Sequence, residues 1–249
     1  PMNDRQRDEF FRKWFPKRSR QVTEIRDFMT RHPHIADVCR TPIVASLVAS
    51  LAERRFDLPQ TRTEVYTRRF DLLLQSWAIV KDIAPRSLLP LEDKKHLLAN
   101  LALHLHKRHE RQFTQRAFEE LWAQRYAASF RQISSSEVFD ELHIANGVLE
   151  HEGGTMYSLG HLSYQEYLAA MAVLYDQSMS TMLDNVGDPW WRQVIVFYVG
   201  LTKDATKVIS RLMTQHGMTA DSPLIRELSA EARLTRPDVI DFVNAIRGE

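Results

Sequence analysis

Three histidines stand close together in one helical segment, and histidine is a common ligand of zinc and other divalent metals. They are His104, His106 and His109. At about 100° per residue, His104 lies about 200° from His106 and about 140° from His109 around a helix. Three rings spread in this way cannot meet at one ion. The spacing therefore predicts surface histidines on a basic helix, and no metal site is expected.

The other residue types with catalytic potential form no recognisable nucleophile or phosphate loop. The single cysteine, Cys39, has no assignable partner base, so we expect a buried structural thiol. One cysteine cannot form an internal disulfide, which fits a reducing compartment. The chain contains no G-x-x-x-x-G-K-[ST], G-x-G-x-x-G, G-x-S-x-G or H-E-x-x-H motif. We therefore predict no catalytic residue in this chain.

Composition is typical of a soluble globular protein. The 249 residues are 44% hydrophobic and 26% charged, and no apolar run approaches the roughly 18 residues of a membrane span. The N-terminus is charged where a secretion signal would be apolar. A net charge of +1 gives no global attraction to nucleic acid or anionic lipid, and the basic group at residues 13–20 is interpreted as solvated surface. We expect a cytoplasmic protein without a membrane partner.

Glycine and proline divide the chain into helical segments. None of the eight glycines precedes Gly147, and prolines recur at intervals that suit helix starts and stops. Apolar residues at helical spacing, such as Tyr66, Phe70 and Trp77, support helices in this region. We predict helices near residues 3–14, 21–31, 42–54, 61–82, 91–109, 115–128, 135–145, 188–201, 204–216, 222–233 and 237–247.

A short hairpin is predicted near residues 147–160. Its two runs flank Gly153-Gly154, a pair that can adopt positive φ in a tight turn. Two helices followed by this hairpin give the element order of a winged helix. The next helix is predicted to begin with a capping box, in which Ser163 and Glu166 each bond the backbone amide of the other.

These elements predict a mainly α fold in three parts. Residues 1–85 form a small helical domain, and residues 86–178 form a winged-helix domain that contains the hairpin. Residues 179–249 begin a C-terminal helical domain of antiparallel helix pairs, joined by short segments with Gly, Asp or Pro.

A winged helix suggests DNA binding, which would place the helix before the hairpin in the major groove. From Ser134 to Asn146 this segment holds Glu137, Asp140 and Glu141 and no Lys or Arg. Contacts to DNA phosphates need cations, so these charges argue against groove reading. A packing or switching role is favoured, and nucleic acid is not an expected partner.

The segment Tyr157–Ala170, YSLGHLSYQEYLAA, resembles the end of the winged-helix domain in NACHT-family STAND NTPases. The shared features are an aromatic strand, a histidine, a Ser/Thr cap and an aromatic-Q-E-aromatic helix start. Thr41–Leu47 is similar to the proline-led helix that follows the nucleotide core of this family, and Leu58–Trp77 is similar to its next helix. Gly187–Val194 is similar to the tryptophan-rich start of the helices beyond the winged helix. The resemblance covers about residues 8–202 and implies the C-terminal portion of a bacterial signalling ATPase.

The resemblance implies two nucleotide-binding residues. His161 matches the winged-helix histidine that contacts the β-phosphate of ADP and holds the closed, inactive state, and Pro42 matches the proline that packs near the adenine. An imidazole at a strand-to-helix joint can donate a hydrogen bond to a phosphate oxygen. The alternatives are that His161 bonds a neighbouring backbone carbonyl and that Pro42 is an ordinary helix-start proline. Gln165 and Glu166 are assigned to capping and packing.

The resemblance also implies a regulatory chain. The Walker A and Walker B segments of the family lie upstream of the matching region and are missing here, so this chain alone should not hydrolyse ATP. ADP or ATP is expected as a cofactor only together with the NTPase core. The implied partners are that core and the sensor and effector domains of the same polypeptide, with self-oligomerisation on activation. The implied biology is antiviral or other innate-immune-like defence.

Two other functions remain open from the sequence. A stand-alone helical protein-interaction module needs no nucleotide, and its gene would encode no G-x-x-x-x-G-K-[ST] motif upstream. A winged-helix DNA-binding regulator would bind DNA with a strong dependence on salt. The resemblance favours nucleotide-state sensing over both.

Overall fold

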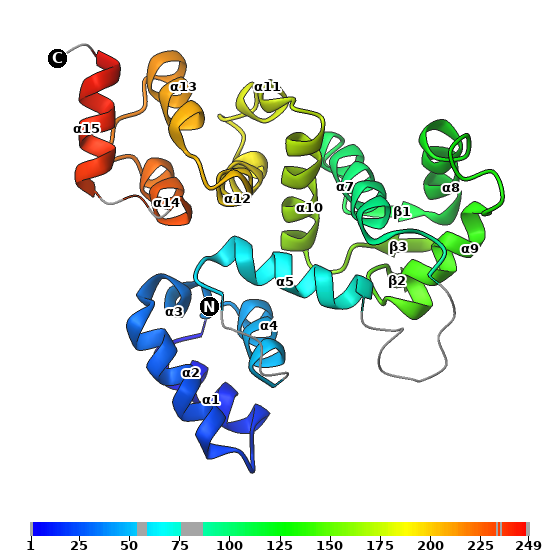
Figure 1. The fold of residues 1–249 in the computed structure, drawn as a ribbon, viewed down its shortest axis with the longest axis horizontal. Helices are drawn as coiled ribbons and strands as arrows, with labels where there is room; N and C mark the ends of the chain where they lie inside the picture. The colour runs from blue at the N-terminus through cyan, green and yellow to red at the C-terminus, as the bar shows by residue number, and fades with distance from the viewer. Residues whose placement is uncertain (1, 54–58, 76–86, 233, 235, 248–249) are drawn as a thin grey trace.

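The computed structural model describes residues 2–53, 59–75, 87–232, 234 and 236–247 (Figure 1). The chain is mainly helical and carries one small antiparallel sheet, which confirms the predicted fold class. Within the described ranges, no helix has both the length and the apolar character needed to cross a membrane. The predicted boundary at residues 85 and 86 and the end of the helix predicted over 61–82 lie outside the described residues.

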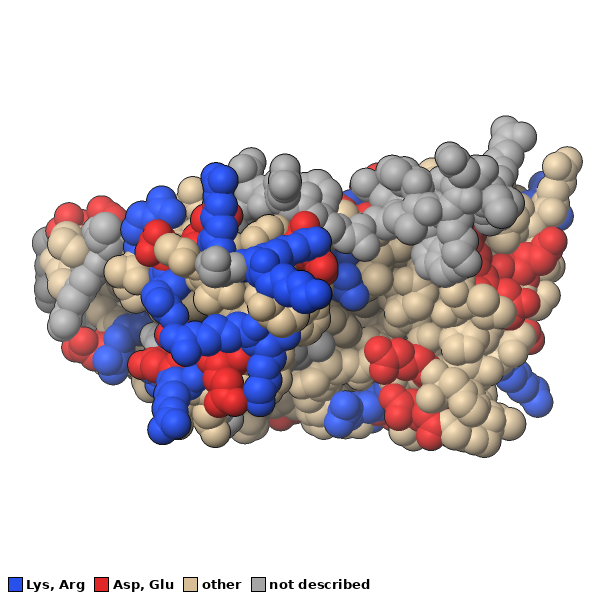
Figure 2. Space-filling view, turned by 90° about the horizontal axis from the view of Figure 1, so that it is seen from below, with Lys and Arg blue, Asp and Glu red and all other residues tan. Residues whose placement is uncertain are grey.

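Helices pack against one another at the N-terminal end of the chain. Their bounds are α1 (Asp4–Trp14), α2 (Ser19–Arg31), α3 (Pro33–Val38), α4 (Pro42–Glu53) and α5 (Arg62–Gln75). The sequence predicted all of them except α3, which is too short for a periodic apolar pattern to stand out. On the face shown in Figure 2, Lys and Arg side chains gather over the part that contains α1 and α2, with Asp and Glu among them. Ion pairs such as Lys13 with Glu9 and Arg20 with Glu24 fit a solvated surface.

The middle of the chain folds into helices around a three-stranded sheet. The order is α7 (Leu91–Lys107), β1 (Gln112–Thr114), α8 (Gln115–Arg125), α9 (Ser135–Asp140), the π-helical turn η1 (Glu141–Ala145), β2 (Glu150–Gly153), β3 (Met156–Ser158) and α10 (Leu162–Tyr175). The predicted hairpin is formed by β2 and β3, and Gly153 and Gly154 have the expected positive φ, +108° and +59°. β1 was not predicted, because three residues are too few to show strand alternation. It pairs with β3 and places Phe113 opposite Tyr157.

Helices continue to the C-terminal end. They are α11 (Met179–Leu183), the 3-10 turn η2 (Pro189–Trp191), α12 (Arg192–Thr202), α13 (Thr206–His216), α14 (Pro223–Glu231) and α15 (Arg236–Arg247). The short α11 was not predicted, and the other helices lie close to their predicted positions. The boundary expected at residues 178 and 179 stays a prediction.

α10 is the most enclosed helix of the fold. It packs between α7 and α12, and its residues from Gln165 to Val173 are all buried. The small side chains Ala169, Ala170 and Ala172 allow neighbouring helices to approach closely on several sides. Burial on all sides is the pattern of a helix inside a core.

α5 contacts helices from every part of the chain, among them α4, α7, α10 and α12. Tyr66 and Phe70 on α5 stack on Tyr167 of α10, with ring centroids 5.8 and 5.4 Å apart. At its start, the hydroxyl and backbone N–H of Thr63 donate to Glu231 Oε2 on α14, at 2.8 and 3.3 Å. A Cβ at Gly200 of α12 would lie 2.0 Å from Thr63 Oγ1, so this close crossing requires glycine. α5 is therefore shared between the predicted domains.

A buried ion pair fixes the π-helical turn before the hairpin. Lys94 of α7 is 2% exposed, and its Nζ donates to Glu141 Oε1 at 2.5 Å and to Asn146 Oδ1 at 3.3 Å. Asn146 Nδ2 in turn donates to the carbonyl oxygen of Leu73 on α5, at 3.1 Å. Glu141 is therefore a structural residue, and the exposed acids of this helix are Glu137 and Asp140.

Candidate functional site

His161 lies where the chain turns from β3 into α10. It is the N-cap residue of α10, with extended backbone angles, and its side chain is exposed. The preceding residue, Gly160, has φ +73°, a conformation that L side chains rarely adopt. A Cβ at Gly160 would also lie 2.8 Å from Glu150 Oε1 on β2. Glycine therefore permits the turn that presents His161.

Two hydrogen bonds hold the His161 ring through one nitrogen. The backbone N–H of Ser163 donates to Nδ1 at 3.2 Å, and Ser163 Oγ lies 2.7 Å from the same atom. The hydroxyl of Tyr66 on α5 donates to Ser163 Oγ at 2.8 Å. Ser163 and Tyr66 are both buried, at 4% and 0% exposed. The exposed imidazole is therefore anchored to the core on one side only.

The capping box predicted for Ser163 and Glu166 is wrong. α10 begins at Leu162, and the His161 ring accepts the cap bond from the Ser163 amide. The Ser163 hydroxyl instead meets the buried Tyr66 hydroxyl, which needs a partner because an unpaired buried polar group is costly. The prediction that Gln165 packs is supported by its burial, and its Nε2 donates to the carbonyl oxygen of Glu110 at 2.9 Å.

Two arginines act on His161, and the same two arginines act on the buried Glu166 of α10. Partial burial lowers the pKa of His161 from its ordinary value, and the positive charges of Arg111 and Arg62 lower it further. Burial raises the pKa of Glu166 to about 7, and the same arginines oppose that rise. His161 is therefore a neutral ring at pH 7, and the two arginines bring positive charge to its surroundings.

Arg62 is fixed at the first residue of α5. Its guanidinium carbon stands 4.7 Å from the ring centroid of Phe197, and its Nη1 lies 3.9 Å from Glu227 Oε1. The same Nη1 donates to Gln193 Oε1. These contacts join the start of α5 to α12 and α14. Arg62 therefore brings a fixed positive charge to the neighbourhood of His161.

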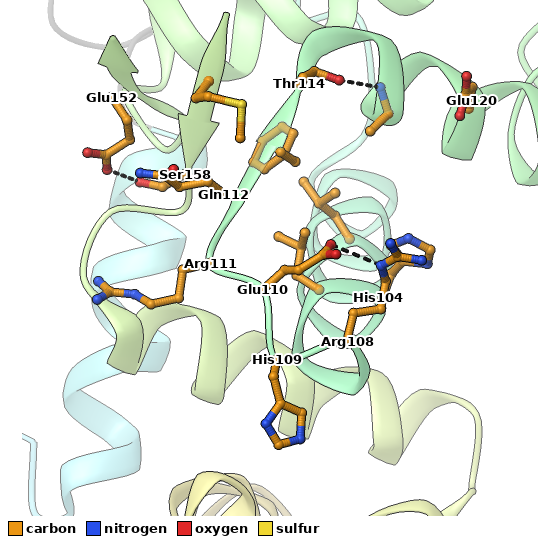
Figure 3. Close-up of a pocket in the computed structure, with 15 residues that line it drawn as sticks. His104, Arg108, His109, Glu110, Arg111, Gln112, Thr114, Glu120, Glu152 and Ser158 are labelled. Atoms are coloured by element: carbon orange, nitrogen blue, oxygen red, sulfur yellow. Dashed lines mark hydrogen bonds and ion pairs between the residues drawn. The ribbon is translucent and has the colours of Figure 1, made fainter.

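Arg111 stands in the loop between α7 and β1, and its side chain is exposed. In Figure 3 it extends away from His104, Arg108 and Glu110, which lie on the other side of the loop. Its charge acts on both His161 and Glu166, so its guanidinium lies near the start of α10. Arg111 is therefore an exposed cation near the start of α10.

A pocket of about 980 Å³ opens beside the sheet, between the end of α7 and β1 (Figure 3). Much of its charge is already paired. Arg108 Nε lies 2.9 Å from Glu110 Oε2, and Ser158 Oγ donates to Glu152 Oε1 at 2.5 Å. The pocket therefore has no single charge character that would select a ligand.

The prediction of surface histidines is wrong for His106. This residue is 0% exposed, and its ring stacks on Trp190 at 4.8 Å and meets the edge of Trp191 at the same distance. Within the described part of the chain, neither ring nitrogen has a hydrogen-bond partner, and burial lowers the pKa of His106 to about 4. His104 and His109 are exposed, as predicted. In the described ranges, no group of His, Cys, Asp and Glu side chains is arranged to hold a metal.

Pro42 is the first residue of α4 and is exposed. α4 and α10 both pack against α5, but the described structure joins Pro42 to His161 by no hydrogen bond or ring contact. Its place beside an adenine therefore stays a prediction. Cys39 is buried as predicted, and burial raises the pKa of its thiol to about 12, so it is unreactive at neutral pH.

Sequence reasoning missed the neighbours of His161. Tyr66 belongs to a periodic apolar stripe and was interpreted as core, although its hydroxyl anchors the Ser163–His161 pair. Arg62 and Arg111 were assigned no role near His161. A possible signal was that Tyr66 and Arg62 both stand on α5, within a segment that resembles the same family.

Paired helices, a three-stranded sheet with a β2–β3 wing and a closing helix define a winged-helix domain. Residues 62–173 match the family described as a winged helix-turn-helix domain C-terminal to NACHT. Those residues are therefore a member of this NACHT-associated family, and they run from the first residue of α5 into α10. A comparison with curated proteins found no match. The bacterial origin stays a prediction.

Proposed function

We propose that this chain is the nucleotide-state-sensing and signal-transmitting part of a NACHT-type STAND ATPase. The observation that carries the proposal is the match of residues 62–173 to a domain found C-terminal to NACHT, which implies an NTPase context. The chain contains no Walker A motif, so the NTPase core would hold the nucleotide's phosphates and Mg²⁺. This chain would then report which nucleotide is bound.

His161 is the residue proposed to contact the β-phosphate of ADP. Three features support this role: its exposed ring, its position at the start of α10, and the nearby charges of Arg62 and Arg111. The free amides at a helix N-terminus favour anions, and the two arginines act in the same direction. Pro42, exposed at the start of α4, is proposed to pack near the adenine.

A single contact of this kind is strong enough to act as a switch. A hydrogen bond to a charged group contributes about 2 kcal/mol, which changes the ratio of closed to open protein about 30-fold. Loss of the His161 contact on exchange of ADP for ATP would therefore favour opening. We propose that the opened winged helix exposes a face for self-oligomerisation, and that the response serves defence signalling in the cytoplasm.

The helical segment before the hairpin, formed by α9 and η1, supports a protein-facing role over DNA binding. Its exposed side includes Glu137 and Asp140, together with Ile144, which is 69% exposed. The two acids repel phosphates, and the exposed apolar side chain beside them suits a protein surface. A DNA-binding role would require salt-dependent binding, and titrations that stay flat at low salt would exclude it.

The direct test is ADP binding measured by calorimetry. We expect tight binding only when the chain is joined to the segment encoded upstream of it, and weaker binding in the His161→Ala variant. His151→Ala is the matched control, because His151 is also an exposed histidine of the same domain but lies on β2 and bonds the carbonyl oxygen of Gly154. Basal signalling should rise in the His161→Ala protein and stay unchanged in the control.

Two results would overturn the proposal. Failure of the joined protein to bind ADP would favour a helical protein-interaction module. Tight ADP binding that is unaffected by His161→Ala would remove the sensing role of His161.

A further inference from the structure

We propose that Ser163 and Tyr66 are positioning residues that hold His161 in the neutral tautomer whose Nε2–H faces outward, toward an anionic oxygen. The identity of that oxygen, a nucleotide phosphate, rests on the proposed function. The tautomer itself is a property of this chain and can be measured without nucleotide.

The tautomer follows from the direction of the hydrogen bonds. A neutral imidazole has one N–H donor and one nitrogen that accepts. The backbone N–H of Ser163 can only donate, so Nδ1 of His161 is the acceptor. The Ser163 hydroxyl receives the Tyr66 proton and directs its own proton to the same Nδ1. The ring proton must then reside on Nε2.

The buried position of Tyr66 keeps this arrangement in place. Its ring contacts Tyr167 at 5.8 Å and Phe197 at 4.8 Å, so the phenol cannot turn away from Ser163 without disturbing the core. A buried hydroxyl without a partner costs about 1–3 kcal/mol. The core of the winged-helix domain therefore selects which nitrogen of the exposed histidine carries the proton.

The surroundings also oppose a charged ring. Protonation would place a hydrogen on Nδ1, where two donors already point. The charged and titratable groups that act on this ring are Arg62 of α5 and Arg111 of the loop before β1, and Glu166 lies within reach of the same two cations. Both arginines disfavour a third positive charge. Recognition by His161 is thus a directed hydrogen bond from a neutral ring, while the arginines supply the charge.

Nitrogen NMR of the histidine rings tests the proposal on the full chain without nucleotide. The His161 signals are assigned by their loss in a His161→Gln variant. We expect an unprotonated Nδ1 and a protonated Nε2 at pH 7.5, and a midpoint of titration below that of a free histidine. Ser163→Ala keeps the backbone donor and removes the hydroxyl donor, so we expect a minor Nδ1-protonated tautomer to appear beside the major one and the midpoint to rise, and Ser163→Thr should restore the wild-type signals.

A second buried serine provides the matched control. Ser229 of α14 is 8% exposed, and its hydroxyl donates to the carbonyl oxygen of Ile225 at 2.7 Å. Ser229→Ala should lower stability without changing the His161 tautomer. If Ser163→Ala does not fold, Tyr66→Phe gives the same readout, because it frees the Ser163 hydroxyl to rotate.

The proposal is overturned if wild-type His161 exchanges between tautomers, or if its signals are the same in Ser163→Ala. It stands if the tautomer is fixed in the wild type and mixed in Ser163→Ala. A fixed tautomer in a protein whose ADP binding ignores His161→Ala would overturn the proposed function and leave the positioning role intact. Weaker ADP binding by Ser163→Ala, with rescue by Ser163→Thr, would support both.

Discussion

Two histidines of the winged-helix domain occupy opposite surroundings. His161 is exposed and anchored by two hydrogen bonds, whereas His106 is fully buried against Trp190 and has no hydrogen-bond partner within the described structure. Burial lowers the pKa of both rings, and for His106 the value falls to about 4. The comparison shows that one ring is anchored through a single nitrogen and stays exposed, whereas the buried ring serves packing at a cost. Here that packing joins α7 to the helices after the winged helix.

The largest expected effect is the pH dependence of folding stability that the buried His106 causes. Its folded pKa of about 4 lies below the ordinary 6.5, so the unfolded chain takes up the proton first as the pH falls. Stability is retained above pH 6.5 and lost between 6.5 and about 4, by about 3 kcal/mol. His106→Leu should flatten this loss in urea unfolding measured at several pH values. Parallel curves for variant and wild type would contradict the assignment, and exposed His104→Leu is the control.

Glu166 should give the stability of the protein a pH dependence opposite to that of His106. Its folded pKa of about 7 exceeds the ordinary 4.5, so its contribution is present at low pH and is lost as the pH rises through 7. Glu166→Gln should therefore stabilise the protein by about 3 kcal/mol at pH 8 and by less than about 1 kcal/mol at pH 5. Denaturation at the two pH values checks this, with exposed Glu120→Gln as control. Equal effects at pH 8 and pH 5 would contradict a raised pKa at Glu166.

The hydrogen bonds that hold the His161 ring can be disrupted by removing the Ser163 hydroxyl, which accepts a hydrogen bond from Tyr66. Ser163→Ala leaves a buried phenol without an acceptor and should cost about 1–2 kcal/mol in unfolding free energy. The double variant with Tyr66→Phe should lose less than the sum of the single losses, because both partners are then absent. Strictly additive losses in a double-mutant cycle would show that the two hydroxyls do not interact.

The smallest expected effect lies in the turn that presents His161. Gly160→Ala places a side chain at φ +73° and close to Glu150, and should cost about 1 kcal/mol. Gly154→Ala, at φ +59° with no neighbour within 4 Å, isolates the backbone part of that cost. Thermal unfolding of the two variants compares them. A larger loss at Gly154 would show that the crowding by Glu150 is unimportant.

The sequence predicted the helices and the hairpin well, because proline, glycine and apolar spacing are local signals. The surroundings of each histidine were not predicted, because they depend on distant contacts. His106 is covered by Trp190 and Trp191, and Ser163 is diverted from capping by Tyr66, which is 97 residues away. His161 was proposed as a site residue through a family resemblance and stays a prediction, whereas the charges of Arg62 and Arg111 beside it became visible only in three dimensions.

The position of α5 has a consequence for how the chain unfolds. The helix packs on α4 and on α10, and Thr63 at its start is bonded to Glu231 of α14. An element that is core to several neighbours cannot melt without exposing all of them. We therefore expect the described helices that contact α5, from α4 to α14, to unfold together, and strain introduced at Glu231 to reach the helix that carries Tyr66.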